Sequence, residues 1–142
     1  MKKSLIYGAV LPEKIADSIA HHQRKTNIGA HSIFLGQVRA DCIDEKNVVA
    51  IDYTCYEEMA EKIFNEIRES AFIKYDLTCA HIYHSTGKVN VGEICLFVFT
   101  SSKHRAMAFD ACQFIVEEIK LKAPVFGKEL FADNSNKWKV NT

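Results

Sequence analysis

Hydrophobic and polar positions along the 142-residue chain follow two periods, and these periods predict where strands and helices lie. Residues 4–10 predict a short first strand. Pro12 suits the first turn of a helix, and Ile15 and Ile19 provide a narrow apolar face that continues to about Lys25. The chain therefore opens with a strand followed by an amphipathic helix.

The next third of the chain predicts two strands and a long helix. Residues 29–39 are rich in strand-forming residues around an interior Gly36, which is typical of a bulge or a close backbone approach. Residues 48–56 alternate as a second strand, and residues 40–47 between them predict a polar, mobile loop. We expect these two strands to pair antiparallel. Residues 57–74 predict a helix with a continuous apolar stripe.

The last third predicts two further strands, a helix and a hairpin. Residues 77–85 form a third long strand, and residues 86–93 read as a turn-rich connection. Residues 94–101 are nearly all apolar, which predicts a central strand covered on both faces. After Pro124, two short strands around a turn at residues 132–136 predict a terminal hairpin.

The helix between residues 94–101 and Pro124 carries the most informative polar residues. Its expected buried face consists of Phe109, Cys112, Val116 and Ile119, which recur at steps of three and four. His104 and Arg105 stand at its start, where the helix dipole disfavours cations, so they make sense if an anion binds there. Lys120 in its last turn is compatible with simple solvation.

The order of elements predicts one α+β domain spanning residues 1–142, with a mainly antiparallel sheet and packed helices. Apolar residues make up 48% of the chain, enough for one core. The sequence contains no run of about 18 apolar residues, so no membrane span is expected. Charge is balanced at 18 basic and 18 acidic residues, which argues against a nucleic-acid partner.

The five cysteines are odd in number and show no C-x-x-C spacing. We expect them to be small buried residues of a protein in a reducing cytoplasm. Cys79, His81 and His84 come nearest to a metal-binding cluster. Because residues 79 and 81 share one face of a strand and residue 84 points away, no metal site is expected.

Cationic residues are the remaining candidates for a functional site, and most of them lie at the ends of predicted elements. They are Arg39, His104, Arg105, Lys120 and Lys128. The arginine guanidinium matches a phosphate, and a lysine near other cations can act as an acid or base at neutral pH. The set predicts an enzyme acting on a small phosphorylated anion. Spacing alone leaves open whether these residues converge.

Four blocks stand in order along the chain: G-A-x-x-x-F-x-G-x-V-R from Gly29, Y-E-E-M-A-E-K from Tyr56, H-x-x-G-x-V-x-V-G-E from His84 and S-x-H-R-x-x-A-F-x-A-x-x-F from Ser102. With the A-P segment that follows Lys120, they resemble the large, catalytic subunits of molybdopterin synthase, the MoaE family. The resemblance covers nearly the whole chain and implies an α/β-hammerhead-like domain.

The resemblance also implies an activity and partners. Such subunits are sulfurtransferases of molybdenum cofactor biosynthesis that convert cyclic pyranopterin monophosphate (precursor Z) to molybdopterin. Two sulfurs come from the C-terminal Gly-Gly thiocarboxylate of a small ubiquitin-like partner subunit. The large subunits form a central homodimer within a heterotetramer. The resemblance implies no cofactor.

Residue roles follow from the same resemblance. Lys120 would be the principal catalytic lysine. The substrate-binding residues would be Phe34, Gln37, Val38, Arg39, His104, Arg105, Gly127 and Glu129. The family commonly has a catalytic lysine where this chain has Gly127, and we hypothesise that Lys128 replaces it. A basic residue that relatives supply from the tail after Trp138 is expected to be missing here.

Two other interpretations remain open. The glycine at position 127 favours a non-catalytic, dimeric binding module that senses a phosphorylated metabolite. An RNA-binding domain is opposed by the balanced charge and by the lack of an aromatic stacking motif on a strand.

Overall fold

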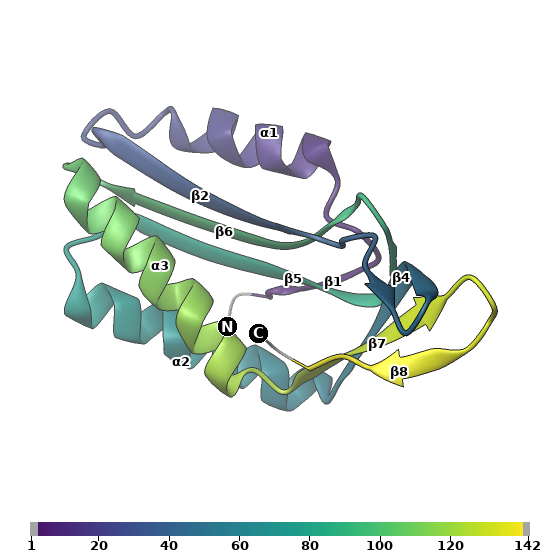
Figure 1. The fold of residues 1–142 in the computed structure, drawn as a ribbon. Helices are drawn as coiled ribbons and strands as arrows, with labels where there is room; N and C mark the ends of the chain where they lie inside the picture. The colour runs from purple at the N-terminus through teal and green to yellow at the C-terminus, as the bar shows by residue number, and fades with distance from the viewer. Residues whose placement is uncertain (1–2, 141–142) are drawn as a thin grey trace.

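The computed structural model describes residues 3–140, which form three helices and eight strands (Figure 1). In chain order the elements are β1 (Leu5–Tyr7), α1 (Pro12–His22), β2 (Ala30–Gln37), β3 (Cys42–Ile43), β4 (Lys46–Cys55), α2 (Glu57–Lys74), β5 (Cys79–Asn90), β6 (Ile94–Ser102), α3 (Arg105–Lys122), β7 (Val125–Phe131) and β8 (Asn136–Trp138). No helix of this described part is long and apolar enough to cross a membrane.

The strands form one sheet in the order β2-β6-β5-β4-β7-β8, and every neighbouring pair on this path is antiparallel. β1 pairs parallel with β5, and β3 pairs with β4. In Figure 1, α2 and α3 lie on one side of the strands and α1 lies on the other. The predicted α+β class and the terminal β7–β8 hairpin are confirmed.

β6 is the centre of the core, as its apolar sequence predicts. Leu96 and Val98 belong to the cluster beneath α2 and α3, whereas Phe97 and Phe99 belong to the cluster beneath α1. All four side chains are at most 1% exposed. Complete burial of side chains of this size stabilises the fold by roughly 1.5–3 kcal/mol each. Both faces of β6 therefore contribute to stability.

α2 has the predicted bounds, and its apolar stripe explains its position. Ala60, Phe64, Ile67 and Ala71 are buried at steps of three and four against the sheet and α3. Buried Glu61 lies on the same helix, and its carboxylate accepts hydrogen bonds from the backbone amides of Ser4 (2.7 Å) and Leu5. This contact attaches the N-terminal segment to α2.

The expected pairing of the strands at residues 29–39 and 48–56 is wrong. β2 pairs with β6, and β4 lies between β5 and β7. Alternation shows which face of a strand is buried but does not specify its partner. The bulge predicted at Gly36 is confirmed, because the β2–β6 register shifts between Gly36 and Gln37.

Two predicted loops contain strand. Residues 86–90 continue β5 rather than forming a turn, and the turn falls at residues 91–93. Within residues 40–47, β3 and the start of β4 form a hairpin around Asp44 and Glu45, whose φ angles are +52° and +65°. Two consecutive positive φ values suit the right-handed twist of a two-residue hairpin.

The predicted buried face of α3 is partly wrong. Cys112 and Ile119 are buried as expected, but Phe109 is 59% exposed. The remaining buried positions are Ala108, Ala111 and Ile115. Small alanines face the sheet because β2 and β6 approach α3 closely, and periodicity based on large side chains missed them.

Candidate active site

A cavity of about 280 Å³ lies where the end of β2 meets β4, β7 and the last turn of α3. It is lined by Phe34, Leu35, Gly36, Gln37, Arg39, Asp41, Ile51, Tyr53, Cys95, Leu96, Lys120, Glu129 and Lys139. Its charged residues are three cations, Arg39, Lys120 and Lys139, and two carboxylates, Asp41 and Glu129. The lining therefore carries a small excess of positive charge, which suits an anionic ligand.

Lys120 reaches the cavity from the last turn of α3. The neighbouring Ile119 is buried in the core, so the orientation of the helix places Lys120 outside the core and at the cavity wall. Arg39 approaches from the end of β2, and its Nη2 forms an ion pair with Asp41 Oδ2 at 3.2 Å. The Arg39 side chain is 67% exposed, and such pairs contribute only ~0–1 kcal/mol. A phosphate can therefore displace Asp41 at little cost.

The floor of the cavity is formed by Gly36, Tyr53 and Cys95. Cys95 donates a hydrogen bond to the Gly36 carbonyl at 3.4 Å. Burial raises the pKa of the Tyr53 hydroxyl, and the adjacent Cys95 thiol raises this pKa further. A Cβ at Gly36 would lie 3.2 Å from Leu96 Cβ, so glycine permits β2 to approach β6 here. The buried carboxylate of Glu129, which is 5% exposed, also lines the cavity, so charge is present inside it as well as at the rim.

His84 lies behind this floor, in a smaller cavity shared with Tyr53, Lys120, Gly127 and Lys139. Its Nδ1–H donates to the backbone oxygen of Ser85 at 2.8 Å. The pKa of His84 is lowered to about 4, mainly by burial; the Ser85 hydrogen bond opposes this shift and the Lys120 charge adds to it. His84 is therefore neutral at pH 7 and adds no charge beside Lys120.

Lys139 is a cation of the cavity lining that the sequence analysis missed. It follows β8, and its backbone N–H donates to the Gly127 carbonyl at 2.8 Å. Its side chain is half-buried and lines the same cavity as Lys120. The expectation that the tail after Trp138 supplies no basic residue to the site is therefore wrong. The tail's position beside β7 follows from tertiary pairing, which hydrophobic periodicity does not reveal.

Gly127 has little room for a side chain. A Cβ there would lie 2.9 Å from Ile51 Cγ2 and 3.2 Å from Tyr53 Cε1. Contacts this short force the neighbouring side chains to shift. Glycine at position 127 therefore avoids a clash with Ile51 and Tyr53, and Lys139 lines the smaller cavity beside it.

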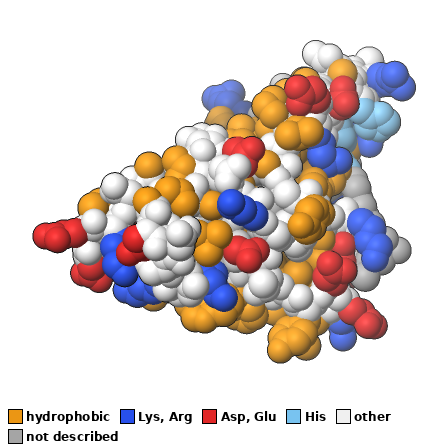
Figure 2. Space-filling model, turned by 90° about the vertical axis from the view of Figure 1, so that its right-hand side faces the viewer, with side chains coloured by type: hydrophobic (Ala, Val, Ile, Leu, Met, Phe, Trp, Pro, Cys, Tyr) orange, Lys and Arg blue, Asp and Glu red, His pale blue; other side chains and the backbone are white. Residues whose placement is uncertain are grey.

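An apolar groove of about 510 Å³ adjoins the cavity. Its lining residues are Thr54, Cys55, Tyr56, Phe126, Gly127, Trp138 and Lys139. Tyr56, Phe126 and Trp138 are each more than half exposed. Gly127 and Lys139 border both this groove and the smaller cavity that contains Lys120. Figure 2 shows this end of the molecule, where apolar side chains lie among charges of both signs.

Residues 11–122 match the family model of the MoaE protein. This chain belongs to the MoaE family. The molybdopterin synthase catalytic subunit of Pyrococcus abyssi is 38% identical over 113 residues, which cover 80% of this chain and 75% of that protein. Molybdopterin synthase catalytic subunit 1 of Aedes aegypti is 37% identical over 131 residues, which cover 90% and 81%. The family resemblance drawn from the sequence is confirmed.

Solved structures show the same fold. Molybdopterin synthase from Staphylococcus aureus superposes with a TM-score of 0.84 at 26% identity, over 99% of this chain and 98% of that chain. A complex of subunits 1 and 2 of the Helicobacter pylori molybdopterin-converting factor contains a chain with a TM-score of 0.80 at 22% identity, over 95% and 88%. The second likeness concerns the fold alone.

Most residues predicted for the site of this MoaE-family chain do meet. Those that line the main cavity are Phe34, Gln37, Arg39, Lys120 and Glu129, and Gly127 lines the adjoining cavity and groove. Val38 is buried behind them, with its amide donating to the Glu93 carbonyl and its own carbonyl accepting from Gly92. These backbone hydrogen bonds hold the end of β2 in place, and Val38 does not line the cavity.

Lys128 points elsewhere. Successive residues of a strand face opposite sides, so Gly127 and Glu129 share one face of β7 and Lys128 faces the other. The Lys128 Nζ lies 4.7 Å from the centre of the Trp138 ring, and the residue lines neither cavity that contains Lys120. Within one chain, the hypothesis that Lys128 replaces the lysine at position 127 is not supported by its location.

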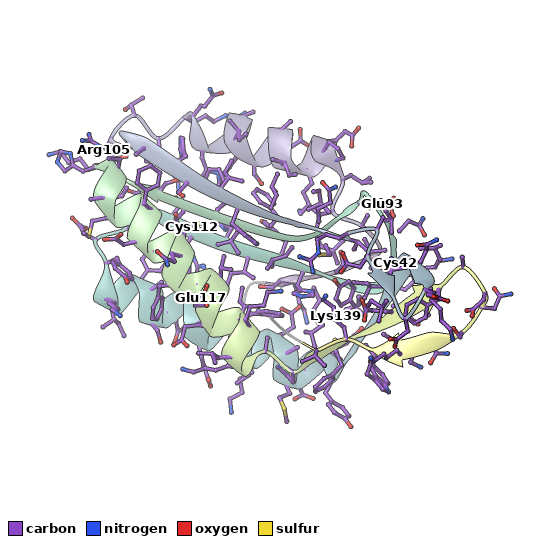
Figure 3. All side chains as sticks on the ribbon, viewed as in Figure 1. Cys42, Glu93, Arg105, Cys112, Glu117 and Lys139 are labelled. Atoms are coloured by element: carbon purple, nitrogen blue, oxygen red, sulfur yellow. The ribbon has the colours of Figure 1, made fainter. Side chains whose placement is uncertain are left out.

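His104 and Arg105 lie at the opposite end of α3 from Lys120. His104 is the N-cap residue and both side chains are exposed. Fifteen residues separate Arg105 from Lys120, which corresponds to about 22 Å of helix. Figure 3 shows Arg105 at one end of the molecule and Lys139 toward the other. The expectation that they join Arg39 in one pocket is therefore wrong within a single chain.

Proposed function

We propose that this chain is the catalytic subunit of a molybdopterin synthase. It binds cyclic pyranopterin monophosphate (precursor Z) in the cavity at Lys120 and receives sulfur from the C-terminal thiocarboxylate of a small ubiquitin-like partner subunit. The observation that supports this most strongly is the convergence of Arg39, Lys120 and Lys139 on one cavity, in a chain of the MoaE family.

The cavity residues have distinct tasks in this reaction. Arg39 exchanges Asp41 for the substrate phosphate, since a guanidinium binds phosphate oxygens in pairs. A new bond joins the thiocarboxylate sulfur to a pterin side-chain carbon while a carbon–oxygen bond at that carbon breaks, and the oxygen leaves with the electron pair. Water then attacks the partner's acyl carbon, the bond from that carbon to the sulfur breaks, and the sulfur stays on the pterin. The partner leaves as a carboxylate. Lys120 stabilises the negative charge that develops on oxygen during both steps.

The apolar groove beside the cavity suits the partner's tail. A Gly-Gly segment is narrow enough to lie extended between Tyr56, Phe126 and Trp138. Lys139 stands where the groove reaches the Lys120 cavity, so its charge attracts the anionic end of that tail. We assign Lys139, rather than Lys128, as the second lysine of the reaction.

His104 and Arg105 take part through a second copy of the chain. A single chain keeps the start of α3 about 22 Å from Lys120 of its own cavity. In the proposed homodimer, the start of one α3 lies toward the cavity of the other protomer. Exposed apolar side chains on the edge strand β2 and at the start of α3, Ile33, Leu35 and Phe109, form a surface that such a dimer covers. With one small subunit per large subunit, the assembly is a heterotetramer.

The decisive experiment is a reconstituted conversion assay. Purified chain is mixed with a thiocarboxylated small subunit and precursor Z, and formation of the dithiolene product is followed. Conversion by the wild-type chain is the expected result. If the chain binds the pterin and the small subunit without forming product, the proposal fails and the alternative of a non-catalytic sensor takes its place.

A further inference from the structure

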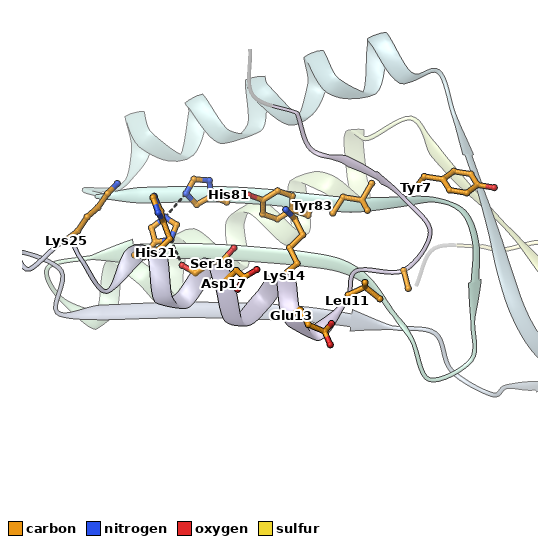
Figure 4. A pocket seen from close by; sticks show the side chains of 13 residues that line it. Tyr7, Leu11, Glu13, Lys14, Asp17, Ser18, His21, Lys25, His81 and Tyr83 are labelled. Carbon is orange, nitrogen blue, oxygen red and sulfur yellow. Dashed lines mark hydrogen bonds between the residues drawn. The ribbon is translucent and has the colours of Figure 1, made fainter.

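Three potential metal ligands meet on the face of the sheet opposite the Lys120 cavity. His22 is the last residue of α1, and Cys79 and His81 begin β5. One ligand atom from each, two histidine nitrogens and the Cys79 sulfur, lie within 4.8 Å of one another. His22 and Cys79 are each 4% exposed, and His81 is partly buried. Figure 4 shows the surrounding pocket, between α1 and the sheet.

The fold brings these residues together for ordinary packing reasons. Ile15 and Ile19 of α1 pack against Phe97 and Phe99, which places the last turn of the helix over the start of β5. Cys79 and His81 share that face, as strand alternation predicts. His84 lies on the other face, so the third ligand is His22, which is distant in sequence.

Hydrogen bonding determines which nitrogen of His22 faces the cluster. The His22 Nδ1 lies 2.7 Å from the carbonyl oxygen of Ser18, and a carbonyl only accepts, so Nδ1 carries a proton. In neutral His22 the Nε2 therefore presents a lone pair. This Nε2 lies 2.8 Å from Nε2 of His81. A ring nitrogen held by a backbone carbonyl while the other faces ligand atoms is the usual arrangement of a zinc-bound histidine.

The spacing of the two nitrogens is close to that in a tetrahedral zinc site. With Zn–N bonds of about 2.0–2.1 Å, two coordinating nitrogens lie about 3.3 Å apart. The two Nε2 atoms must separate by about 0.5 Å to reach that spacing, which small rotations of the imidazole rings accomplish. Two imidazoles and a thiolate are ligands that zinc favours over magnesium or calcium.

We propose that His22 Nε2, His81 Nε2 and Cys79 Sγ bind one Zn²⁺ ion. Binding releases the Cys79 thiol proton to solvent, and His81 carries its remaining proton on Nδ1. The fourth coordination position faces the groove of about 640 Å³ between α1 and β5, where a water molecule completes the tetrahedron. This inference does not rest on the proposed synthase activity, because the groove lies across the sheet from the Lys120 cavity.

Lys25 contacts the proposed sulfur ligand. Its Nζ donates a hydrogen bond to Cys79 Sγ at 3.0 Å. Its amide also donates to the His22 carbonyl at 3.1 Å, which fixes the chain just after α1. The ion therefore links the end of α1 to β5, in a region where α1 otherwise packs through few large apolar residues.

Cobalt substitution tests the site directly. Tag-free protein is stripped with a chelator and titrated with Co²⁺. We expect one equivalent to bind, with the intense visible absorption of tetrahedral Co²⁺ and a thiolate-to-cobalt charge-transfer band in the near ultraviolet. Zn²⁺ should displace the cobalt, and Zn²⁺ alone should raise the melting temperature of the stripped protein.

Two ligand variants and two matched controls make the result interpretable. Cys79→Ser should remove the charge-transfer band, and His81→Gln should weaken Co²⁺ binding by more than the ~10–100-fold typical of outer-shell changes. Cys42→Ser, at an exposed cysteine, and His31→Gln, at a histidine outside the cluster, should bind as the wild type does. Circular dichroism establishes that each variant is folded.

Two outcomes would overturn the zinc site. One is an octahedral, weakly absorbing Co²⁺ spectrum shared by the wild type and both ligand variants. The other is a Zn²⁺-dependent rise in melting temperature that persists unchanged in Cys79→Ser and His81→Gln. Either result would mean that the three residues only pack and hydrogen-bond with one another.

Discussion

The two faces of β5 carry histidines in opposite surroundings. His84 lies among Tyr53 and Phe64, with ring centres 5.3 and 6.0 Å away, and burial lowers its pKa to about 4. His81, on the other face, meets the nitrogen of His22 beside the sulfur of Cys79. Of two histidines on one strand, His84 is therefore a neutral buried side chain behind the Lys120 cavity. His81 belongs to the group of potential metal ligands on the other face.

This difference shows that neighbours from other elements determine what a histidine does. α3 and β7 bring Lys120 and apolar contacts to His84, so its charged form is disfavoured. α1 brings a second imidazole to His81, and the Nε2 atoms of His22 and His81 lie 2.8 Å apart. The predictions below concern the Lys120 face, and the cobalt titration tests the opposite face.

The largest expected effect is that of Lys120→Ala on turnover. Removal of a group that stabilises developing charge typically lowers kcat by ~10²–10³-fold, and binding of the small subunit should change little. The measurement is the reconstituted conversion assay together with calorimetric titration of the small subunit. Lys122→Ala is the matched control, because Lys122 is exposed and pairs with Glu118 at 3.0 Å. An equal loss of turnover and partner binding would assign Lys120 to docking instead.

The buried His84 should make the fold sensitive to acid. Its pKa in the folded state is about 4 against an ordinary value of 6.5, so the unfolded chain binds a proton first as the pH falls. Stability is therefore complete above pH 6.5 and is lost progressively toward pH 4. At pH 5 this linkage amounts to roughly 2 kcal/mol.

Urea unfolding at pH 7.5 and pH 5 measures this loss. His84→Gln removes the titrating group and should show a smaller decrease between the two pH values than the wild type. His31→Gln, which removes an exposed histidine, should decrease as much as the wild type. If His84→Gln and the wild type lose the same stability, burial of His84 is not the cause.

Replacing Lys139 is expected to lower activity less than replacing Lys120, and replacing Lys128 is expected to lower it least. Loss of one hydrogen bond to a charged group costs ~1.5–3 kcal/mol, so Lys139→Ala should lower kcat/KM at least about 10-fold. Lys128→Ala should retain most activity, because the Lys128 amine lies against Trp138 and not in the cavity. The same conversion assay compares the two. A greater loss for Lys128→Ala would restore it as the replacement for the missing lysine.

The smallest expected effect is a steric one at Gly127. Gly127→Ala places a methyl group 2.9 Å from Ile51 Cγ2, and relief of this contact should cost about 1 kcal/mol of unfolding free energy. The measurement is urea unfolding at pH 7.5. The control is Lys88→Ala, which changes an exposed strand residue. Gly92→Ala is unsuitable because Gly92 has a φ of +87°. A stabilised Gly127→Ala variant would mean that Ile51 moves aside without cost.

Sequence patterns predicted most of the elements but not all of their relations. The bounds of α2 and the burial of β6 followed directly from apolar periodicity, because both elements bury large side chains at regular steps. Phe109 was wrongly predicted to be buried because the face of α3 toward the sheet consists partly of alanines. Alanine is weakly hydrophobic, so the periodicity did not show which face of the helix is buried. Pairing of β2 with β6 rather than β4 was not predictable, since strand alternation carries no information about partners.

By itself, the sequence determined the family and the α+β class, and the family resemblance implied that Arg39 and Lys120 share a site. These properties depend on local sequence blocks and periodicities, which can be recognised without knowledge of how the elements pack. Only the tertiary structure decided that Lys139 joins Lys120, that Lys128 faces Trp138, and that His22 completes a cluster with Cys79 and His81. Each of these depends on contacts between segments distant in the chain, and such contacts arise only when sheet register and helix docking are set together.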